Sequence, residues 1–363
     1  MTIKRVRWDA GRVISLEHES KILKGNPLGD PRRRRLDVWL PPGYDTGRRK
    51  LPVLFDLVGY TGSGPSHTNW RNFDENVPER IARLLHKGSI GPCIIVFPDC
   101  FTALGGNQYI NSSAIGRYAD YLTRELIPFV DSEFRTHASR DHRGCFGKSS
   151  GGYGAMIHGM KYSKYWGAIA VHSGDSYFDF VYRCDWPGAL DTLAKHRRRK
   201  RGAGPINIAH EAKNTGAGTD DGRIRRFLKH FWGKPNPSGA EIECLMMIAM
   251  AASYDPNPDV PNGFYLPFDL ETGELITARW KKWLSHDPIN LVSRYRENLK
   301  TLRGIFVDCG WNDQYRIHYG SRILSSRLRD NGIEHRYEEF DGTHSGVDYR
   351  MDVSLPYLYK ALS

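Results

Sequence analysis

The chain has 363 residues, of which 40% are hydrophobic and 12% aromatic, so a packed core is expected and wholesale disorder is excluded. No apolar run approaches the length of a membrane span, and the first residues, MTIKRVRWDAGRV, carry charges where a signal peptide needs an apolar stretch. We therefore expect a cytoplasmic protein with one large α/β domain, or a core with a sizeable insertion.

The net charge of +11 comes largely from two basic runs, RRRR at 32–35 and KHRRRKR at 195–201. Such runs favour either nucleic-acid or anionic-surface binding, or a solvated face and a surface loop. The sequence contains no zinc-finger, RNP or helix-turn-helix pattern, so nucleic acid is not expected to be a main partner. The oligomeric state is left open, a homo-oligomer included.

The cysteines are scattered and form neither a C-x-x-C pair nor a zinc-binding spacing with histidine. We expect them to be free, buried thiols in a reducing compartment. They are Cys93, Cys100, Cys145, Cys184, Cys244 and Cys309.

The expected elements alternate between apolar strands and amphipathic helices. Residues 1–50 favour β structure, and nearly continuous apolar runs further along the chain are typical of strands buried on both faces of a sheet. This alternation predicts an α/β fold with a mostly parallel central sheet and helices on both faces. Further strands are expected at 50–59, 93–100, 142–148, 166–174, 301–310 and 335–344, and helices at 77–88, 118–134, 153–162 and 318–332.

The alternation stops between 176 and 290, where Gly, Pro and aromatic residues are frequent. We predict a mostly helical and irregular cap insertion (176–290) between two parts of the core, 1–175 and 291–363. Most of its aromatic residues should form the core of the cap itself, while some of them would line an apolar or aromatic-ester pocket. They include Tyr177, Phe178, Phe180, Trp186, Phe231, Trp232, Tyr254, Phe264, Tyr265, Phe268, Trp280 and Trp283.

The stretch GCFGKSSGGYG (144–154) follows an apolar strand and opens a helix, which is the setting of a G-x-S-x-G nucleophile elbow. In this tight turn the residues two positions either side of the nucleophile must lack bulk. Gly147 and Gly151 flank Ser149 in this way, whereas Ser150 would have Lys148 as a neighbour. The spacing of a Walker-type phosphate loop is absent. Ser149 is the candidate nucleophile. Lys148, a charged residue within the turn, is expected either to face solvent or to meet a partner in the cap.

A serine nucleophile needs a general base and an acid that orients the base. Among the acids after Ser149, Asp313 lies just beyond the strand at 301–310, while Asp308 lies within it. His344 follows the last strand in the turn FDGTHSG; its rivals His318 and His335 begin a helix and a strand. The chain order Ser, Asp, His is that of the α/β-hydrolase triad, so we expect Asp313 and His344 to serve Ser149.

Two backbone N–H groups are candidates for the oxyanion hole. The N–H of Ser150 lies at the start of the helix after the nucleophile, where unpaired N–H groups point outward. The second donor should come from the loop LVGYTGSG (57–64), in which Gly59 allows close approach and Tyr60 is the chosen donor.

The sequence resembles α/β-hydrolase esterases that include S-formylglutathione hydrolases, feruloyl and acetylxylan-type esterases, enterochelin esterases and mycolyltransferases. The resemblance rests on LPVLFDLVGYTG, on PDC with GGNQYINSS and YADYLTRELIPFVDSEF, on HRGCFGKSSGGYGAM, on CGWNDQY and on YEEFDGTH. It covers roughly 40–175 and 300–350, and it implies the roles given above for Ser149, Asp313, His344, Tyr60 and Ser150. Lys148, Ser150 and the long insertion depart from the group's usual pattern, which leaves the substrate open.

The sequence therefore predicts a serine carboxylic-ester hydrolase that needs no metal or organic cofactor. Short-acyl, aromatic (feruloyl-type) or carbohydrate-linked esters are the expected substrates. A thioesterase of the S-formylglutathione hydrolase type and an acyltransferase use the same triad and are alternatives. A more distant alternative is a basic binding protein that has kept a hydrolase fold without catalysis.

Overall fold

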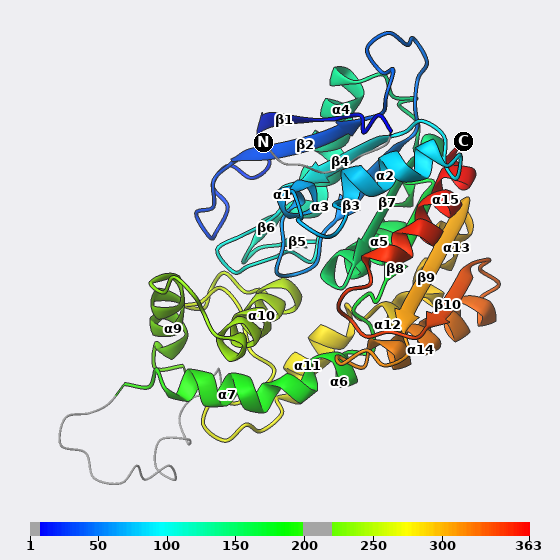
Figure 1. Ribbon diagram of the computed structural model, residues 1–363. Coiled ribbons are helices and arrows are strands. Elements are labelled where there is room, and N and C mark those ends of the chain that lie inside the picture. The colour runs from blue at the N-terminus through cyan, green and yellow to red at the C-terminus, as the bar shows by residue number, and fades with distance from the viewer. Residues whose placement is uncertain (1–7, 199–219) are drawn as a thin grey trace.

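A computed structural model of the protein describes residues 8–198 and 220–363, and its centre is an eight-stranded sheet (Figure 1). The strand order is β1-β2-β4-β3-β7-β8-β9-β10. β1 and β2 pair antiparallel, as do β2 and β4, and the remaining neighbours are parallel. The strands are Arg12–Glu19 (β1), Arg33–Leu40 (β2), Val53–Leu57 (β3), Ile94–Pro98 (β4), Arg143–Lys148 (β7), Ala168–His172 (β8), Gly304–Gly310 (β9) and Arg336–Phe340 (β10).

The central strands are covered on both sides. Every residue of β3, β4, β8 and β9 is buried, which agrees with the continuous apolar runs in the sequence. Side chains of β4, β7 and β8 that point to one face pack against α2 (Val77–His86) and α15 (Met351–Leu362). The opposite face packs against α5 (Ser150–Lys161), α14 (Ile317–Asp330) and the helical stretch 118–133. The predicted fold, a mostly parallel sheet with helices on both faces, is confirmed as an α/β-hydrolase fold.

The helical stretch 118–133 contains one local departure from α geometry. It consists of α3 (Tyr118–Asp120), a π-helical turn over Tyr121–Leu126 and α4 (Ile127–Glu133). The remaining short elements are α1 (Gly64–Thr68), the small hairpin β5 (Asn111–Ser112) and β6 (Gly116–Arg117), and α13 (Arg296–Lys300), with 3₁₀ turns at Arg140–His142, Ser163–Tyr165, Arg183–Asp185, Ser293–Tyr295 and Asp348–Arg350.

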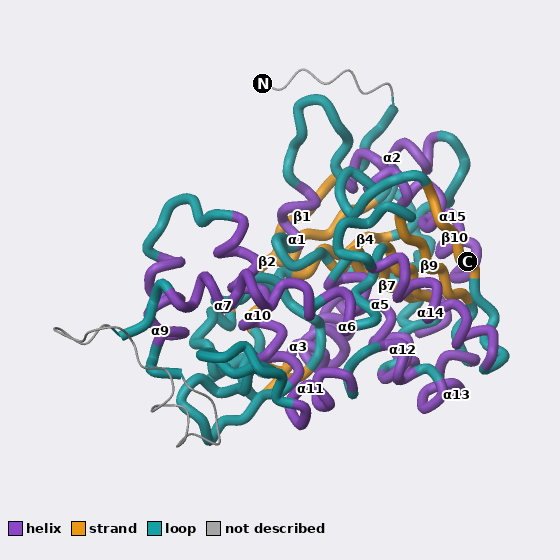
Figure 2. Tube along the Cα trace, turned by 90° about the horizontal axis from the view of Figure 1, so that it is seen from below, coloured by secondary structure: helices purple, strands orange, loops and turns teal. Residues whose placement is uncertain are grey.

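The described parts of the insertion, 176–198 and 220–290, contribute helices and no strand to the sheet. In both views α7, α9 and α10 lie beside the sheet (Figures 1 and 2). The division into core and cap stays a prediction. The insertion's helices are α6 (Phe178–Val181), α7 (Trp186–Ala194), α9 (Arg223–Trp232), α10 (Gly239–Tyr254) and α11 (Thr277–Leu284), followed by α12 (Pro288–Leu291).

Most of the insertion's aromatic residues pack against one another. Tyr254 stacks near Phe178 and Trp283, and Trp186 meets Phe268 and Trp280, each pair with ring centroids between 5.0 and 5.4 Å apart. Phe180 and Trp232 are exposed. The expectation that most of these aromatics form a local core agrees with this packing.

The structure can be compared with the expectations for the two basic runs, for the cysteines and for a membrane span. The arginines at 32–35 each have a carboxylate partner, Glu19, Glu17, Asp99 and Asp37 in turn, so this run is a neutralised strand face. Of the run 195–201, residues 199–201 lie outside the described residues.

Five cysteines are buried, but Cys184 is exposed, because it lies on a surface 3₁₀ turn of the insertion. Among the described residues, no helix is both long and apolar enough to cross a membrane.

Candidate active site

The turn at Ser149 has the strained geometry of a nucleophile elbow. It joins β7 to α5, and Ser149 adopts φ 58° and ψ −124°, a conformation that side chains other than glycine rarely occupy. A Cβ at Gly147 would lie 2.2 Å from the Leu57 carbonyl oxygen, and one at Gly151 would lie 1.7 Å from the same atom. Both glycines are therefore required by the approach of β3, as predicted from the motif.

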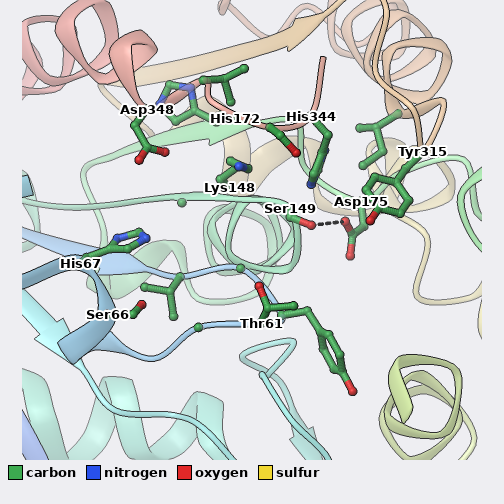
Figure 3. Close-up of a pocket in the computed structure, with 18 of the residues that line it drawn as sticks. Thr61, Ser66, His67, Lys148, Ser149, His172, Asp175, Tyr315, His344 and Asp348 are labelled. Atoms are coloured by element: carbon green, nitrogen blue, oxygen red, sulfur yellow. Dashed lines mark hydrogen bonds between the residues drawn. The ribbon is translucent and has the colours of Figure 1, made fainter. Parts of the chain in front are cut away.

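The predicted acid and base are brought together at the same edge of the sheet. His344 Nδ1 lies 2.8 Å from Asp313 Oδ2, and both side chains are almost fully buried. The ring of His344 points toward Ser149 (Figure 3). Since Nδ1 is engaged by the carboxylate, Nε2 is the ring nitrogen left to face the serine.

Backbone contacts fix the two loops that carry this pair. Trp311 N–H donates to the Phe340 carbonyl (3.0 Å) and Asn312 N–H donates to that of Gly342 (3.1 Å), so the loop after β9 continues the pairing with β10. The His344 N–H donates to Gln314 Oε1 at 2.8 Å. The Tyr315 ring meets the His344 ring edge-on, with centroids 4.9 Å apart. The WNDQY loop thus orients the imidazole from several directions.

The rival residues lie elsewhere. Asp308 is buried within β9, where it contacts His172 and Arg350. His335 shares a hydrogen bond with Ser325 Oγ at 2.8 Å. His318 lies on α14 with its ring 4.2 Å from that of Tyr319. None of the three is positioned beside Ser149 in the described structure, which agrees with the preference for Asp313 and His344.

The two expected oxyanion donors are free to take a ligand. Neither the N–H of Tyr60 nor that of Ser150 has an acceptor within residues 8–198 and 220–363. Ser150 is the first residue of α5, so its N–H has no partner inside the helix. The phenol of Tyr60 donates to the Leu104 carbonyl at 2.7 Å, and this hydrogen bond holds the loop 57–64 in place.

Asp175 is a site residue that the sequence reasoning missed. Ser149 Oγ donates to Asp175 Oδ1 at 3.4 Å (Figure 3), and Tyr182 OH donates to Asp175 Oδ2 at 2.9 Å. Burial raises the pKa of Asp175, opposed by the Tyr182 hydrogen bond and the nearby His344. Its loop contains two strained residues, Ser173 (φ 41°) and Tyr177 (φ 61°). Its position three residues beyond the end of β8 is the sequence feature that could have identified Asp175 as a site residue.

A further hydrogen-bond chain links this carboxylate to the insertion. Gln108 Nε2 donates to Ser150 Oγ at 2.6 Å, and Tyr254 OH donates to Gln108 Oε1 at 3.1 Å. Ser150 Oγ in turn donates to Asp175 Oδ2 at 3.4 Å. The side chain of Ser150 is thus a buried structural group, while its backbone N–H has no acceptor among the described residues.

Ser149 and His344 line one cavity of about 460 Å³, called here the Ser149 cleft. The insertion supplies Val181, Tyr182, Ile242, Glu243 and Met246 to its wall, and none of the aromatics singled out in the sequence is among the lining residues. The Phe and Tyr side chains of the lining are instead Tyr60, Phe146, Tyr182 and Tyr315. Within the described residues, no cluster of His, Cys, Asp or Glu side chains is arranged to hold a metal ion.

Lys148 also lines the Ser149 cleft, on the side formed by the core. Figure 3 shows it between Ser149 and Asp348, with His67 on the same side of the cleft. Its lining neighbours on that side, His67, Arg71 and Asp348, all belong to the core. Lys148 is partly exposed, and the loop before α2 and the loop after His344 supply its neighbours on that side.

Comparisons with known proteins find relatives among esterases. Esterase Rv1288 and Esterase MT1326, both from Mycobacterium tuberculosis, are each 34% identical to this chain over 145 residues, which are 38% of this chain. The match spans only 28% of the length of these relatives.

Solved structures share the fold over nearly the whole chain. A ferulic acid esterase has a TM-score of 0.60 at 17% identity, with 96% of this chain and 98% of that chain covered. An S-formylglutathione hydrolase from Agrobacterium tumefaciens has a TM-score of 0.54 at 15% identity, with both chains covered completely. The model of the family described as "Putative esterase" matches residues 30–354. The chain therefore belongs to this esterase family.

Proposed function

We propose that the protein is a serine carboxylic-ester hydrolase that works through Ser149, His344 and Asp313. In the resting arrangement the Ser149 hydroxyl donates to Asp175. Rotation toward His344 Nε2 lets the imidazole take the proton while Oγ attacks the ester carbonyl. Asp313 holds the ring in the correct tautomer and stabilises the imidazolium. His344 then protonates the leaving alcohol, and water activated by the same base releases the acid.

The remaining groups stabilise charge and shape the cleft. The N–H groups of Tyr60 and Ser150 would hold the oxyanion of the tetrahedral intermediate, because both lack other acceptors among the described residues. The insertion, whose residues line one wall of the Ser149 cleft, acts in this proposal as a cap. No step requires a metal or an organic cofactor.

The strained Ser149 beside the Asp313–His344 pair carries the proposal. Hydrolysis of p-nitrophenyl acetate and methyl ferulate by the wild type, Ser149→Ala and Ser150→Ala tests it. Ser149→Ala should lose about 10⁴-fold or more in kcat. Ser150→Ala should stay folded with partial activity, because it keeps its backbone N–H. Near wild-type activity in Ser149→Ala would refute the nucleophile assignment.

Short-acyl and aromatic esters are the substrates we propose. A ferulic acid esterase among the structural neighbours motivates methyl ferulate as a probe, and an S-formylglutathione hydrolase of the same fold motivates a thioester. Matched oxygen esters and thioesters of one acyl group, compared by kcat/KM, distinguish an esterase from a thioesterase. Adding acceptor alcohols and analysing the products distinguishes hydrolysis from acyl transfer.

A further inference from the structure

The Ser149 cleft continues into a second cavity of about 400 Å³, called here the basic annex. Both cavities are lined by His67, Arg71, Lys148, Ser345 and Asp348, so a molecule bound at Ser149 can extend into the annex. Figure 3 shows Lys148 between Ser149 and Asp348, and both Lys148 and Asp348 line the two cavities.

The other cations of the annex already have partners. Arg71 donates to Asp348 at 2.9 Å and to Asp74 at 3.1 Å. Arg80 donates to Asp352 Oδ1 at 2.7 Å. These pairs are short and directional, so their charges are committed to holding the wall.

His67 is committed in the same way. Its Nδ1 lies 2.6 Å from Asp56 Oδ2, and Asp56 is buried in β3. Burial disfavours the charged ring, but the Asp56 carboxylate outweighs it and raises the pKa of His67. The His67 ring is thus held by the Asp56 carboxylate within the cleft wall.

Lys148 differs from all of these cations. Its ammonium has no hydrogen bond and no ion pair within residues 8–198 and 220–363, although the side chain is partly buried beside the nucleophile. Burial lowers the pKa of Lys148. The negative charges of Asp348 and Asp313 act in the opposite direction. An ammonium that is partly buried and has no partner is less well solvated than an exposed one, so a ligand that supplies a negative charge gains a charge-assisted contact there.

We propose that Lys148 and the basic annex form a subsite for a negatively charged oxygen group, a carboxylate or phosphate, carried by the ester substrate. This inference rests on the proposed function and specifies the substrate class of the same site. The ester carbonyl sits at Ser149 while the charged group accepts hydrogen bonds from the Lys148 ammonium. Charge-assisted bonds of this kind are among the stronger polar contacts in proteins.

Matched esters that differ only in charge test the subsite. On the acyl side these are the p-nitrophenyl ester of succinic acid and that of its monomethyl ester. On the alcohol side they are 4-acetoxybenzoate and its methyl ester. For each pair we define the charge preference as kcat/KM for the anion divided by kcat/KM for the methyl ester. The wild type should prefer the anion in at least one pair, and a preference for the neutral ester in both pairs would overturn the proposal.

Variants then assign the preference to Lys148. Lys148→Met should lower the charge preference about tenfold or more, whereas Lys148→Arg should retain most of it. Lys87→Met, which removes an exposed lysine at the end of α2, is the matched control and should change nothing. A charge preference in Lys148→Met within about twofold of wild type for both pairs would overturn the proposal. The ratio cancels any general effect of the substitution on catalysis.

Failure of the subsite and failure of the proposed function give different results. If neutral esters are hydrolysed and the charge preference does not depend on Lys148, only the subsite is refuted. If the wild type hydrolyses no ester and no fluorophosphonate labels it, the proposed function is refuted and the subsite with it.

Discussion

Two Ser–His–Asp sets are compared within residues 8–198 and 220–363, and the one with the more complete hydrogen bonds is not the candidate active site. In the buried set, His172 Nδ1 lies 2.7 Å from Asp308 Oδ1 and Nε2 lies 2.8 Å from Ser354 Oγ. In the cleft set, only the His344–Asp313 contact is formed, and the serine hydroxyl donates to Asp175.

The two sets differ in access and in backbone geometry. Ser354 is fully buried inside α15, whereas Ser149 lies on a strained turn that faces the cleft. The charge of Asp308 is balanced by Arg350, whose Nε lies 2.8 Å away. The buried set therefore joins β8, β9 and α15 as a satisfied polar network. A triad is identified by the reach of its nucleophile and its oxyanion donors, and hydrogen-bond geometry alone would select Ser354 in place of the candidate Ser149.

The two aspartates should separate catalysis from stability most strongly. Asp313→Asn should lower kcat by about 10³ to 10⁴-fold, because the amide cannot orient His344 or stabilise its charge. Asp308→Asn should instead cost about 3 kcal/mol of unfolding free energy, because it removes one counter-charge of Arg350 and the buried hydrogen-bond partner of His172. Ester turnover and urea unfolding of both variants measure this, and a larger kcat loss in Asp308→Asn would exchange the roles of the two sets.

The cleft set has a carboxylate besides Asp313, because Asp175 accepts a hydrogen bond from Ser149. Asp175→Asn should lower kcat about tenfold, because the carboxylate stabilises the charge on His344 during proton transfer. Asp185→Asn, another aspartate whose pKa burial raises, lies outside the cleft lining and should keep the wild-type kcat. Equal kcat values in both variants would remove Asp175 from the mechanism.

The same variant makes a pH prediction. Because burial raises the pKa of Asp175 above its value in the unfolded chain, the fold disfavours its ionised form. The free energy of unfolding of the wild type therefore falls as the pH rises from the unfolded-state pKa of Asp175 to its raised pKa in the folded state. The loss of stability persists at neutral pH. Asp175→Asn should unfold at a higher temperature than wild type at pH 7, with the difference shrinking as the pH falls below the raised pKa. A constant difference across pH would contradict this.

Ser354→Ala should have the smallest effect. It removes one hydrogen bond to His172 and should cost about 1 to 2 kcal/mol of unfolding free energy. Its kcat per folded enzyme should equal the wild-type value, because Ser354 has no access to substrate. Chemical unfolding and active-site titration measure the two quantities separately, and a large loss of kcat with unchanged stability would make the buried set catalytic.

The elements and residues that could be predicted from the sequence are those fixed by local chemistry. Apolar runs identified the buried strands, and glycines two residues either side of Ser149 identified the elbow, since any side chain there would collide with Leu57. Asp313 and His344 were predicted because each follows a strand end, and the structure brings their side chains together.

The residues that were missed depend on contacts between distant segments. Asp175 is held by hydrogen bonds with Tyr182 and Gln108, and Gln108 comes from a distant part of the chain. The acids that the motif indicated, Asp308 and Asp313, lie later in the sequence. The surroundings of Lys148 could not be predicted because they come from the loop before α2 and the loop after His344. The buried set joins residues 136 and 182 positions apart, which no local pattern indicates.

Labelling with a fluorophosphonate, followed by mass-spectrometric mapping of the modified peptide, tests the central claim most directly. The reagent reacts with a serine that its own base activates and that solvent can reach. The account predicts one adduct, on Ser149, formed equally in Ser354→Ala and strongly reduced in Asp313→Asn. An adduct on Ser150 or Ser354, or an unlabelled folded wild type, would contradict it.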